Sequence, residues 1–323
     1  MNQLVEKSVL KEIKMSRFDE LREKKSIIVL DGPMGTELER RGYDVNDALW
    51  SAKFLRENPN AIKQIHYDYF EAGADIVTCA SYQASILGFT AAGYTEKEAE
   101  DLIRLSMEIV KAARDEWWEK EGKNSGRPYP LVAGDIGPYG AFLADGSEYT
   151  GKYFPTEQEY RDFHLRRMQI LKDAGAEIFA VETLPKLDEA IVCAKLLEEL
   201  DSDYWLSFSY RNGKQISDGT KLEEVAKNLK GFSHLKAIGV NCTPPEYVQE
   251  IVERYRKSWD GVICVYPNSG ENYDGINKIW LGAADGMTFA DRLEGWKNAG
   301  AGMIGGCCRT KPDDIRKVAE LAK

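Results

Sequence analysis

The chain has 323 residues, of which 43% are hydrophobic, and a formal net charge of −10 at pH 7. The length suits one large α/β domain or two small ones. The acidic balance argues against nucleic acid or an anionic membrane as the main partner, and no apolar run reaches the roughly 18 residues that a membrane span needs. Six cysteines in so long a chain do not form a secreted disulfide framework. We therefore expect a cytoplasmic protein whose thiols are free.

The first 25 residues predict a helical extension in front of the main domain, which we place at residues 26–323. Apolar residues, among them Phe18 and Leu21, recur there at the spacing of a short amphipathic helix. The segment lacks the apolar core and the small-residue cleavage site of a secretory signal.

Eight short apolar runs follow along the chain, and several are continuous rather than alternating, as in strands buried on both faces. They are residues 26–31, 76–80, 131–135, 178–182, 204–209, 237–241, 262–266 and 303–306. The stretches between them have helical periodicity. We expect helices at residues 61–72, 96–118, 157–174, 187–199, 222–229, 245–257, 288–299 and 311–322. Three of these helices end in an Ala-Gly-Ala phrase, whose glycine suits a left-handed C-cap.

Eight alternating strand and helix units in about 300 residues predict an α/β fold of the (βα)8 TIM-barrel type in a single domain. A doubly wound open sheet is the alternative, but no Gly-x-Gly-x-x-Gly motif follows the first strand. In a barrel the chemistry lies at the carboxyl ends of the strands. The residues predicted at those ends are Asp31, residues 78–83 (with Ser81 and Gln83), Asp135, Glu182, Asn241, Cys242, Cys307 and Cys308.

Three cysteines predict a metal site. Cys307 and Cys308 are adjacent, which makes a disulfide between them strained, and they follow the eighth strand, whereas Cys242 follows the sixth. Because these two strand ends flank the seventh, three thiolates can converge as an incomplete tetrahedral Zn2+ site with one open position. The alternative is that all three are small buried apolar residues. Zinc held by three thiolates favours alkyl transfer to a fourth thiol more than hydrolysis.

Several motifs resemble those of the homocysteine S-methyltransferases. They are DGPMGT at residues 31–36, ET at 182–183, GVNC at 239–242 and GGCCR at 305–309. The resemblance extends from about residue 26 to the end of the chain. It implies a (βα)8 barrel and a zinc ion bound by Cys242, Cys307 and Cys308. The segments GDIGPYG at 134–140, DGSEYTG at 145–151 and YPNSGE at 266–271 resemble the compact branch that uses S-methylmethionine or S-adenosylmethionine as the methyl donor.

The resemblance suggests roles for the remaining strand-end and loop residues. We expect Glu182 to bind the ammonium group of homocysteine. Asp31 either contacts the amino acid or caps the helix that begins near residue 35, and Asn241 either orients its loop or binds the amino-acid head group. The family places residues near the thiol after the second strand, where Ser81 and Gln83 lie. For the cationic donor, Asp135, Glu271 and loop aromatic residues such as Tyr139 are candidates.

Other functions remain open from the sequence. They are a zinc hydrolase on a barrel, a non-catalytic zinc or redox sensor, and a methyltransferase for another thiol or seleno-thiol. The sequence does not separate the two sulfonium donors, a monomer from a homodimer, or Met1 from Met15 as the natural start.

Overall fold

Eight parallel strands form a barrel in this computed structural model, which describes residues 15–274, 279–281 and 285–323. The strands are β1 (Ile28–Val29), β2 (Ile76–Thr78), β3 (Leu131–Ile136), β4 (Ile178–Leu184), β5 (Tyr204–Phe208), β8 (Leu235–Asn241), β9 (Val262–Tyr266) and β12 (Met303–Ile304). Their order is β1-β12-β9-β8-β5-β4-β3-β2. A parallel bridge between Leu30 and Ile76 joins the two ends of this order. The predicted TIM-type barrel is therefore confirmed.

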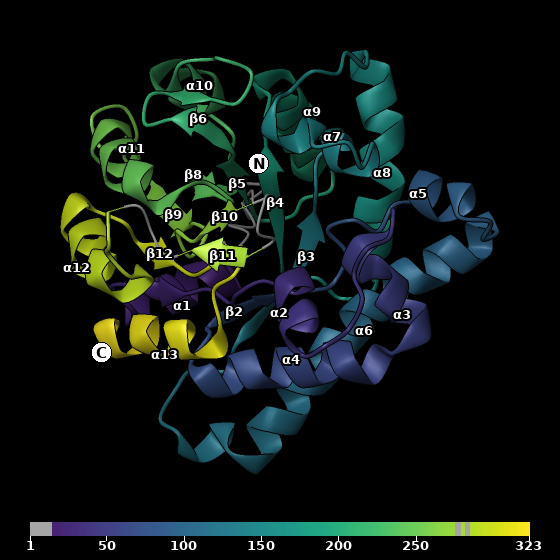
Figure 1. Ribbon diagram of the computed structural model, residues 1–323, viewed down its shortest axis with the longest axis horizontal. Coiled ribbons are helices and arrows are strands. Elements are labelled where there is room, and N and C mark those ends of the chain that lie inside the picture. The colour runs from purple at the N-terminus through teal and green to yellow at the C-terminus, as the bar shows by residue number, and fades with distance from the viewer. Residues whose placement is uncertain (1–14, 275–278, 282–284) are drawn as a thin grey trace, which may run out of the picture.

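Eight main helices surround the strands (Figure 1). They are α4 (Pro59–Ala72), α6 (Glu96–Lys120), α8 (Glu157–Asp173), α9 (Leu187–Glu199), α10 (Leu222–Leu229), α11 (Val248–Tyr255), α12 (Phe289–Ala299) and α13 (Pro312–Leu321). Helix α13 packs against both α12 and α4, so the ring of helices closes as well. The helix expected at residues 245–257 is divided into the 3₁₀ turn η4 (Pro245–Tyr247) and α11.

Local signals explain where these helices begin and end. Capping boxes start α6, α8 and α12, where a threonine and an acidic residue three positions later satisfy each other's backbone N–H groups. The glycines of the three Ala-Gly-Ala phrases, Gly73, Gly175 and Gly300, all have φ between 100° and 119°. The left-handed turns predicted from the sequence are thus present.

Helix α1 (Arg17–Lys24) packs two side chains against the barrel interior. Phe18 and Leu21 are each 3% exposed and pack in one cluster with inward-facing strand residues such as Ile28 and Trp205. A helix is present at Arg17–Lys24, and residues 1–14 of the expected extension lie outside the described residues.

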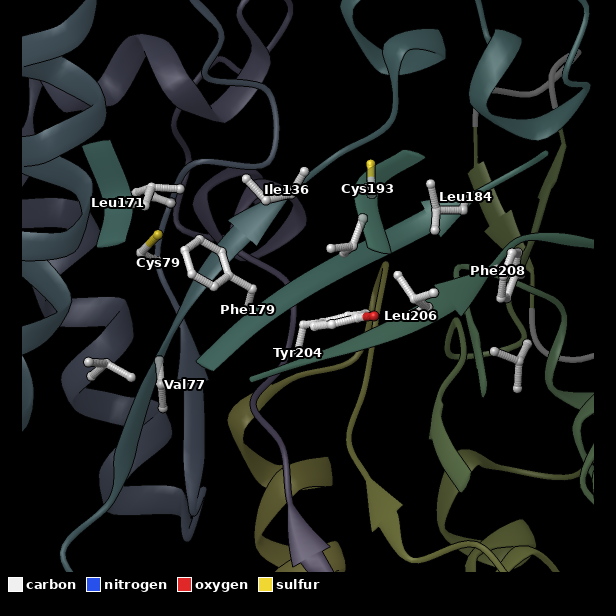
Figure 2. Close-up of a cluster of buried hydrophobic side chains, with 14 of the residues drawn as sticks. Val77, Cys79, Ile136, Leu171, Phe179, Leu184, Cys193, Tyr204, Leu206 and Phe208 are labelled. Atoms are coloured by element: carbon white, nitrogen blue, oxygen red, sulfur yellow. The ribbon is translucent and has the colours of Figure 1, made fainter. Parts of the chain in front are cut away.

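A second, larger core lies between the strands and the surrounding helices. Figure 2 shows part of it, with Phe179 and Leu206 from neighbouring strands and Leu171 from α8. Cys79 and Cys193 are buried in this cluster, and Cys264 is buried inside the barrel. The loops at the carboxyl ends of the strands are therefore available to form a site.

The loops at the carboxyl ends of the strands carry additional short elements. These are α2 (Gly35–Arg40), η1 (Trp50–Lys53), α3 (Phe54–Glu57), α5 (Ile86–Ala91), α7 (Tyr139–Phe142), η3 (Ser147–Tyr149), and the hairpins β6–β7 (Tyr210–Asn212, Gln215–Ile216) and β10–β11 (Asn272–Asp274, Ile279–Leu281). A further 3₁₀ turn, η2 (Gly122–Asn124), follows α6. Within the described residues, every helix is too short or too polar to span a bilayer.

Candidate active site

A cavity of about 320 Å³ opens at the carboxyl ends of the barrel strands. Its floor includes Trp205 and Tyr266 from inside the barrel. Its walls come from the carboxyl ends of β2, β3 and β4 and from the segments that follow β1, β2, β3, β8 and β12. This is the end of a TIM-type barrel where catalytic residues are found. Seven predicted residues line it: Asp31, Gln83, Asp135, Glu182, Cys242, Cys307 and Cys308.

The three cysteines meet at one point of the cavity wall. Their sulfur atoms lie within 4.8 Å of one another. The sulfurs of Cys242 and Cys308 are 3.9 Å apart, and Cys242 and Cys307 are paired as a disulfide with a Cα separation of 5.5 Å. Strand β9 separates the two strands that carry them, so the convergence follows from the order of the sheet.

The backbone around the cysteines is closely packed. The N–H of Cys307 donates to the carbonyl of Pro267 at 2.8 Å. A Cβ atom on Gly305 would lie 2.6 Å from the Cβ of Leu30, closer than packed carbon atoms approach. Cys242 has a φ of 45°, a conformation that costs free energy and persists only where the surroundings enforce it. The fold therefore directs three thiols to a common point.

This group of side chains fits a soft metal ion. Once the Cys242–Cys307 disulfide is reduced, the three thiols are the donor set that zinc takes in incomplete tetrahedral sites. No histidine or carboxylate joins the group within the part of the chain that the structure describes. His66 and His164 lie in helices α4 and α8, and His234 precedes β8. The His and Asp set of a zinc hydrolase is therefore not brought together here.

Three carboxyl groups lie beside the thiols. Asp31 and Asp135 are 7% and 5% exposed, and Glu182 is half-buried with its open surface toward the cavity. Burial raises the pKa of Asp31 to about 7. Burial and the nearby Asp31 raise the pKa of Glu182 to about 8, and burial with the charge of Glu182 raises the pKa of Asp135 well above its usual range. A cationic ligand would relieve this cost of burial and repulsion.

Asp31 is held by the second strand and not by a helix terminus. Its Oδ2 accepts hydrogen bonds from the backbone N–H and the hydroxyl of Thr78, at 2.8 and 3.0 Å. No side chain caps α2, whose N-cap is Met34. In contrast, among the residues that the structure describes, none donates a hydrogen bond to Oδ1 of Asp135.

The backbone next to Glu182 is strained and is held in place by hydrogen bonds. Thr183 has a φ of 57°, and the pairing of β4 with β5 shifts register between Val181 and Leu184. Such an irregularity redirects the neighbouring side chain. The N–H of Thr183 donates to Oδ1 of Asn241 at 2.8 Å, and Nδ2 of Asn241 donates to the Thr183 hydroxyl at 2.7 Å. Asn241 is fully buried and orients the loop without lining the cavity.

Three other predicted residues also lie outside the cavity lining. Ser81 is 1% exposed and donates its hydroxyl to the carbonyl of Asp135 at 2.6 Å. Tyr139 packs against Phe163, with ring centroids 5.0 Å apart. Glu271 accepts from Nε of Arg309 at 2.7 Å. In each case a hydrogen bond or a ring contact with a nearby residue holds the side chain away from the cavity.

Trp50 and Glu148 line the cavity without having been predicted from the sequence, whereas Tyr82 lies in the predicted segment 78–83. Tyr82 and Trp50 form an edge-to-face pair, with ring centroids 6.3 Å apart, at the cavity wall. Trp50 packs on Gly35, where a Cβ atom would lie 2.0 Å from the indole ring. Glu148 also lines the cavity. The second glycine of the DGPMGT motif was the available signal, because it marks a close approach of another group.

Comparison with known proteins identifies the family. The sequence profile described as homocysteine S-methyltransferase matches residues 28–322. The homocysteine S-methyltransferase YbgG of Bacillus subtilis is 49% identical over 298 residues, covering 92% of this chain and 95% of that protein. The chain belongs to the homocysteine S-methyltransferase family. It is therefore a methyltransferase that acts on small molecules.

Solved structures within this family agree with the fold. The metallated form of the homocysteine methyltransferase MmuM from Escherichia coli has a TM-score of 0.84 and 40% identity, covering 94% of this chain and 99% of that one. By sequence, the chain is also similar to the selenocysteine methyltransferase of Astragalus bisulcatus, with 41% identity over 311 residues, covering 91% of both chains. The barrel and the methyltransferase activity predicted from the sequence are thus confirmed.

Proposed function

We propose that this protein transfers a methyl group from a sulfonium donor to the thiol of homocysteine, giving methionine, and that it does so with Zn2+ held by Cys242, Cys307 and Cys308. The observation that carries the proposal is the meeting of three thiols and a cluster of buried carboxyl groups in one cavity. The existence of a metallated form of MmuM supports metal binding by this chain. A zinc ion, when bound, lowers the pKa of a thiol that joins it, so that the thiol is a nucleophilic thiolate near neutral pH.

The carboxyl groups would bind the ammonium group of homocysteine. Glu182 and Asp31 line the same cavity as the cysteines. Burial raises the pKa of both carboxyl groups, and neither forms an ion pair within the part of the chain that the structure describes. The hydroxyl of Tyr266 hydrogen-bonds to Glu182 and favours its charged form. An ammonium group between the two carboxylates would stabilise both.

The remaining wall of the cavity would take the methyl donor. Its polar groups are Asp135, which has an unpartnered oxygen, and Glu148, and its aromatic side chains include Tyr82 and Tyr149. Carboxylates and aromatic faces are the groups that stabilise a sulfonium cation. These residues surround the space that homocysteine leaves free.

The size of the cavity favours S-methylmethionine over S-adenosylmethionine. Its volume of about 320 Å³ is near the lower end of ligand pockets, which begin at about 300 Å³. Homocysteine and S-methylmethionine together have about 18 non-hydrogen atoms, whereas homocysteine and S-adenosylmethionine have about 35, a pair better suited to the larger pockets of that range. We therefore propose S-methylmethionine as the donor.

The transfer itself requires alignment more than proton movement. The acceptor sulfur forms a bond to the methyl carbon while the bond between that carbon and the donor sulfur breaks, and the electron pair of the broken bond stays on the donor. The thiolate loses its negative charge and the sulfonium its positive charge, so a site that excludes water favours the step. Residues that hold the two sulfur atoms in line contribute most to the rate.

A cysteine substitution tests the proposal. We expect Cys308→Ser to reduce both the zinc content and methyl transfer from S-methylmethionine to homocysteine by about 100-fold or more. Cys193→Ser is the control, because it removes a fully buried thiol in α9, outside the cavity lining, and it should retain zinc and activity. Full activity of Cys308→Ser protein that is shown to be free of metal would contradict the proposal.

A second acceptor is supported by the similarity to the selenocysteine methyltransferase of Astragalus bisulcatus. A selenol joins a soft metal as readily as a thiol does. Competition between homocysteine and selenocysteine for limiting donor would test this candidate, and the ratio of the two methylated products gives the preference directly.

A further inference from the structure

The segment between β3 and α8 forms one wall of the cavity. Five of its residues line the cavity: Ala141, Ala144, Gly146, Glu148 and Tyr149. The segment includes the short helices α7 and η3 but no strand that pairs with the barrel. Side chains from several elements hold it: Gln83 donates to the carbonyl of Ala141 and Ser209 to the carbonyl of Glu148, and helices α8 and α9 supply further contacts at its two ends.

A single buried carboxylate makes several of these contacts. Glu189 of α9 is fully buried, and its Oε1 accepts from the backbone N–H of Tyr139 at 2.6 Å and from Nε2 of His164 at 2.8 Å. Its Oε2 accepts from the hydroxyl of Tyr153 at 2.5 Å. Tyr139 and Tyr153 lie at the two ends of the segment, so Glu189 joins both ends to one helix.

The network continues to the first residue of the segment. Nδ1 of His164 is 2.7 Å from a terminal nitrogen of Arg167, which also donates to the carbonyl of Gly137. Because a guanidinium can only donate, Nδ1 of His164 must accept, and Nε2 must carry the proton that it shares with Glu189. Burial and the charge of Arg167 lower the pKa of His164 to about 4, consistent with this neutral tautomer.

The network does not belong to the reaction site itself. Glu189, His164 and Arg167 are each 2% exposed or less, and none of them lines the cavity. A buried carboxylate is costly unless its oxygens are satisfied, and here its donors include groups at both ends of one cavity wall. The carboxylate thus fixes a part of the wall that faces the space left for the donor.

We propose that Glu189, with His164 and Arg167, is a positioning network that sets the wall against which the methyl donor binds, and so controls the alignment of the donor methyl group. This inference rests on the proposed function, because it assumes that the donor occupies the space beside Glu148 and Tyr149. It predicts that loss of the network affects the donor far more than homocysteine, which is held by groups on other strands.

Glu189→Leu is the informative variant, because it leaves the N–H of Tyr139 and the Nε2 proton of His164 unpaired. We expect kcat/KM for S-methylmethionine to fall by about 10- to 100-fold, as expected for a small misplacement of reacting groups. The KM for homocysteine and the zinc content should change less than about 3-fold. Glu189→Gln should rescue most of the loss, because its amide oxygen still accepts both bonds and the Tyr153 hydroxyl can accept from its NH₂ group.

Glu198→Leu is the matched control on the same helix. Glu198 accepts bonds from the backbone N–H groups of Ser233 and His234, at 3.1 and 2.8 Å, in the loop that leads into the start of β8. The Glu198→Leu variant should lower thermal stability without a selective change in kcat/KM for the methyl donor. If Glu189→Leu does not fold, Tyr153→Phe removes one bond of the network and should give a smaller donor-specific loss.

The outcomes separate this inference from the proposed function. Wild-type protein that does not transfer methyl groups from S-methylmethionine to homocysteine refutes the proposed function. The positioning network alone is refuted if the wild-type protein is active and the Glu189 variants change the kinetic constants for both substrates equally or for neither. A selective loss for the donor, rescued by Glu189→Gln, supports it.

Discussion

Replacing Glu182 by glutamine should make the substrate-free protein more stable at alkaline pH. The carboxyl group is costly to ionise where it lies, because burial and Asp31 raise its pKa from 4.5 to about 8. A carboxyl whose pKa is raised by folding contributes its full stability below the unfolded-state value and loses that contribution as the pH rises through the folded-state value. Glutamine has no charge to lose or gain, so the difference between the two proteins should grow between pH 5 and pH 9.

The size of the effect follows from the shift. Each pKa unit corresponds to about 1.4 kcal/mol, so a change from 4.5 to about 8 sets an upper limit of about 5 kcal/mol at pH 9. Water in the cavity reaches part of the Glu182 side chain, and this screens the cost. We expect about 1–3 kcal/mol, or an increase in Tm of about 2–6 °C, with little difference at pH 5.

Thermal unfolding of both proteins at pH 5 and pH 9, without substrate, is the assay. Glu37→Gln is the control, because Glu37 is also a buried carboxyl group, 1% exposed, but is paired with Arg40 and Arg41 at 2.6 and 2.7 Å. Its loss should destabilise the protein at both pH values. The same Glu182→Gln variant should raise the KM for homocysteine by about 10- to 100-fold, the strength of a charged hydrogen bond. A variant that is destabilised at pH 9, or equally stabilised at pH 5, would refute the reasoning.

Two further predictions concern buried residues outside the cavity lining. Asn241→Ala removes both hydrogen bonds to Thr183 and should lower the free energy of unfolding by about 1–3 kcal/mol per buried group left unpaired. It should also raise the KM for homocysteine. Denaturant unfolding measures the stability and initial rates measure the KM; an unchanged KM would show that the hydrogen bonds between Asn241 and Thr183 do not position Glu182. Phe18→Ala, at a position 3% exposed, should lower the free energy of unfolding by about 3–5 kcal/mol while the KM values at permissive temperature stay unchanged; a stability loss below about 1 kcal/mol would contradict the role of α1 in the barrel core.

The fold and the metal cluster were predictable because they depend on short signals with a fixed geometry. Continuous apolar runs define buried parallel strands, and the order of a closed barrel then brings the ends of β8 and β12 to either side of β9. The convergence of Cys242, Cys307 and Cys308 follows directly from that order.

The donor side of the cavity was less predictable, because it depends on loops without periodicity. Nothing in the sequence around Tyr139 separates a cavity aromatic from one that packs on Phe163. Similarly, the pairing of Glu271 with Arg309 joins positions 38 residues apart. Trp50 lines the cavity and contacts Gly35. The glycine marks the close approach of another group, but only the folded loop identifies that group as Trp50.

The zinc X-ray absorption spectrum of zinc-loaded, reduced protein, recorded before and after addition of homocysteine, tests the central claim most directly. We expect three sulfur neighbours around the metal in the free protein and four after homocysteine is added, because the cysteine side chains supply three. A metal environment with fewer than three sulfur atoms, or one that homocysteine leaves unchanged, would contradict the account.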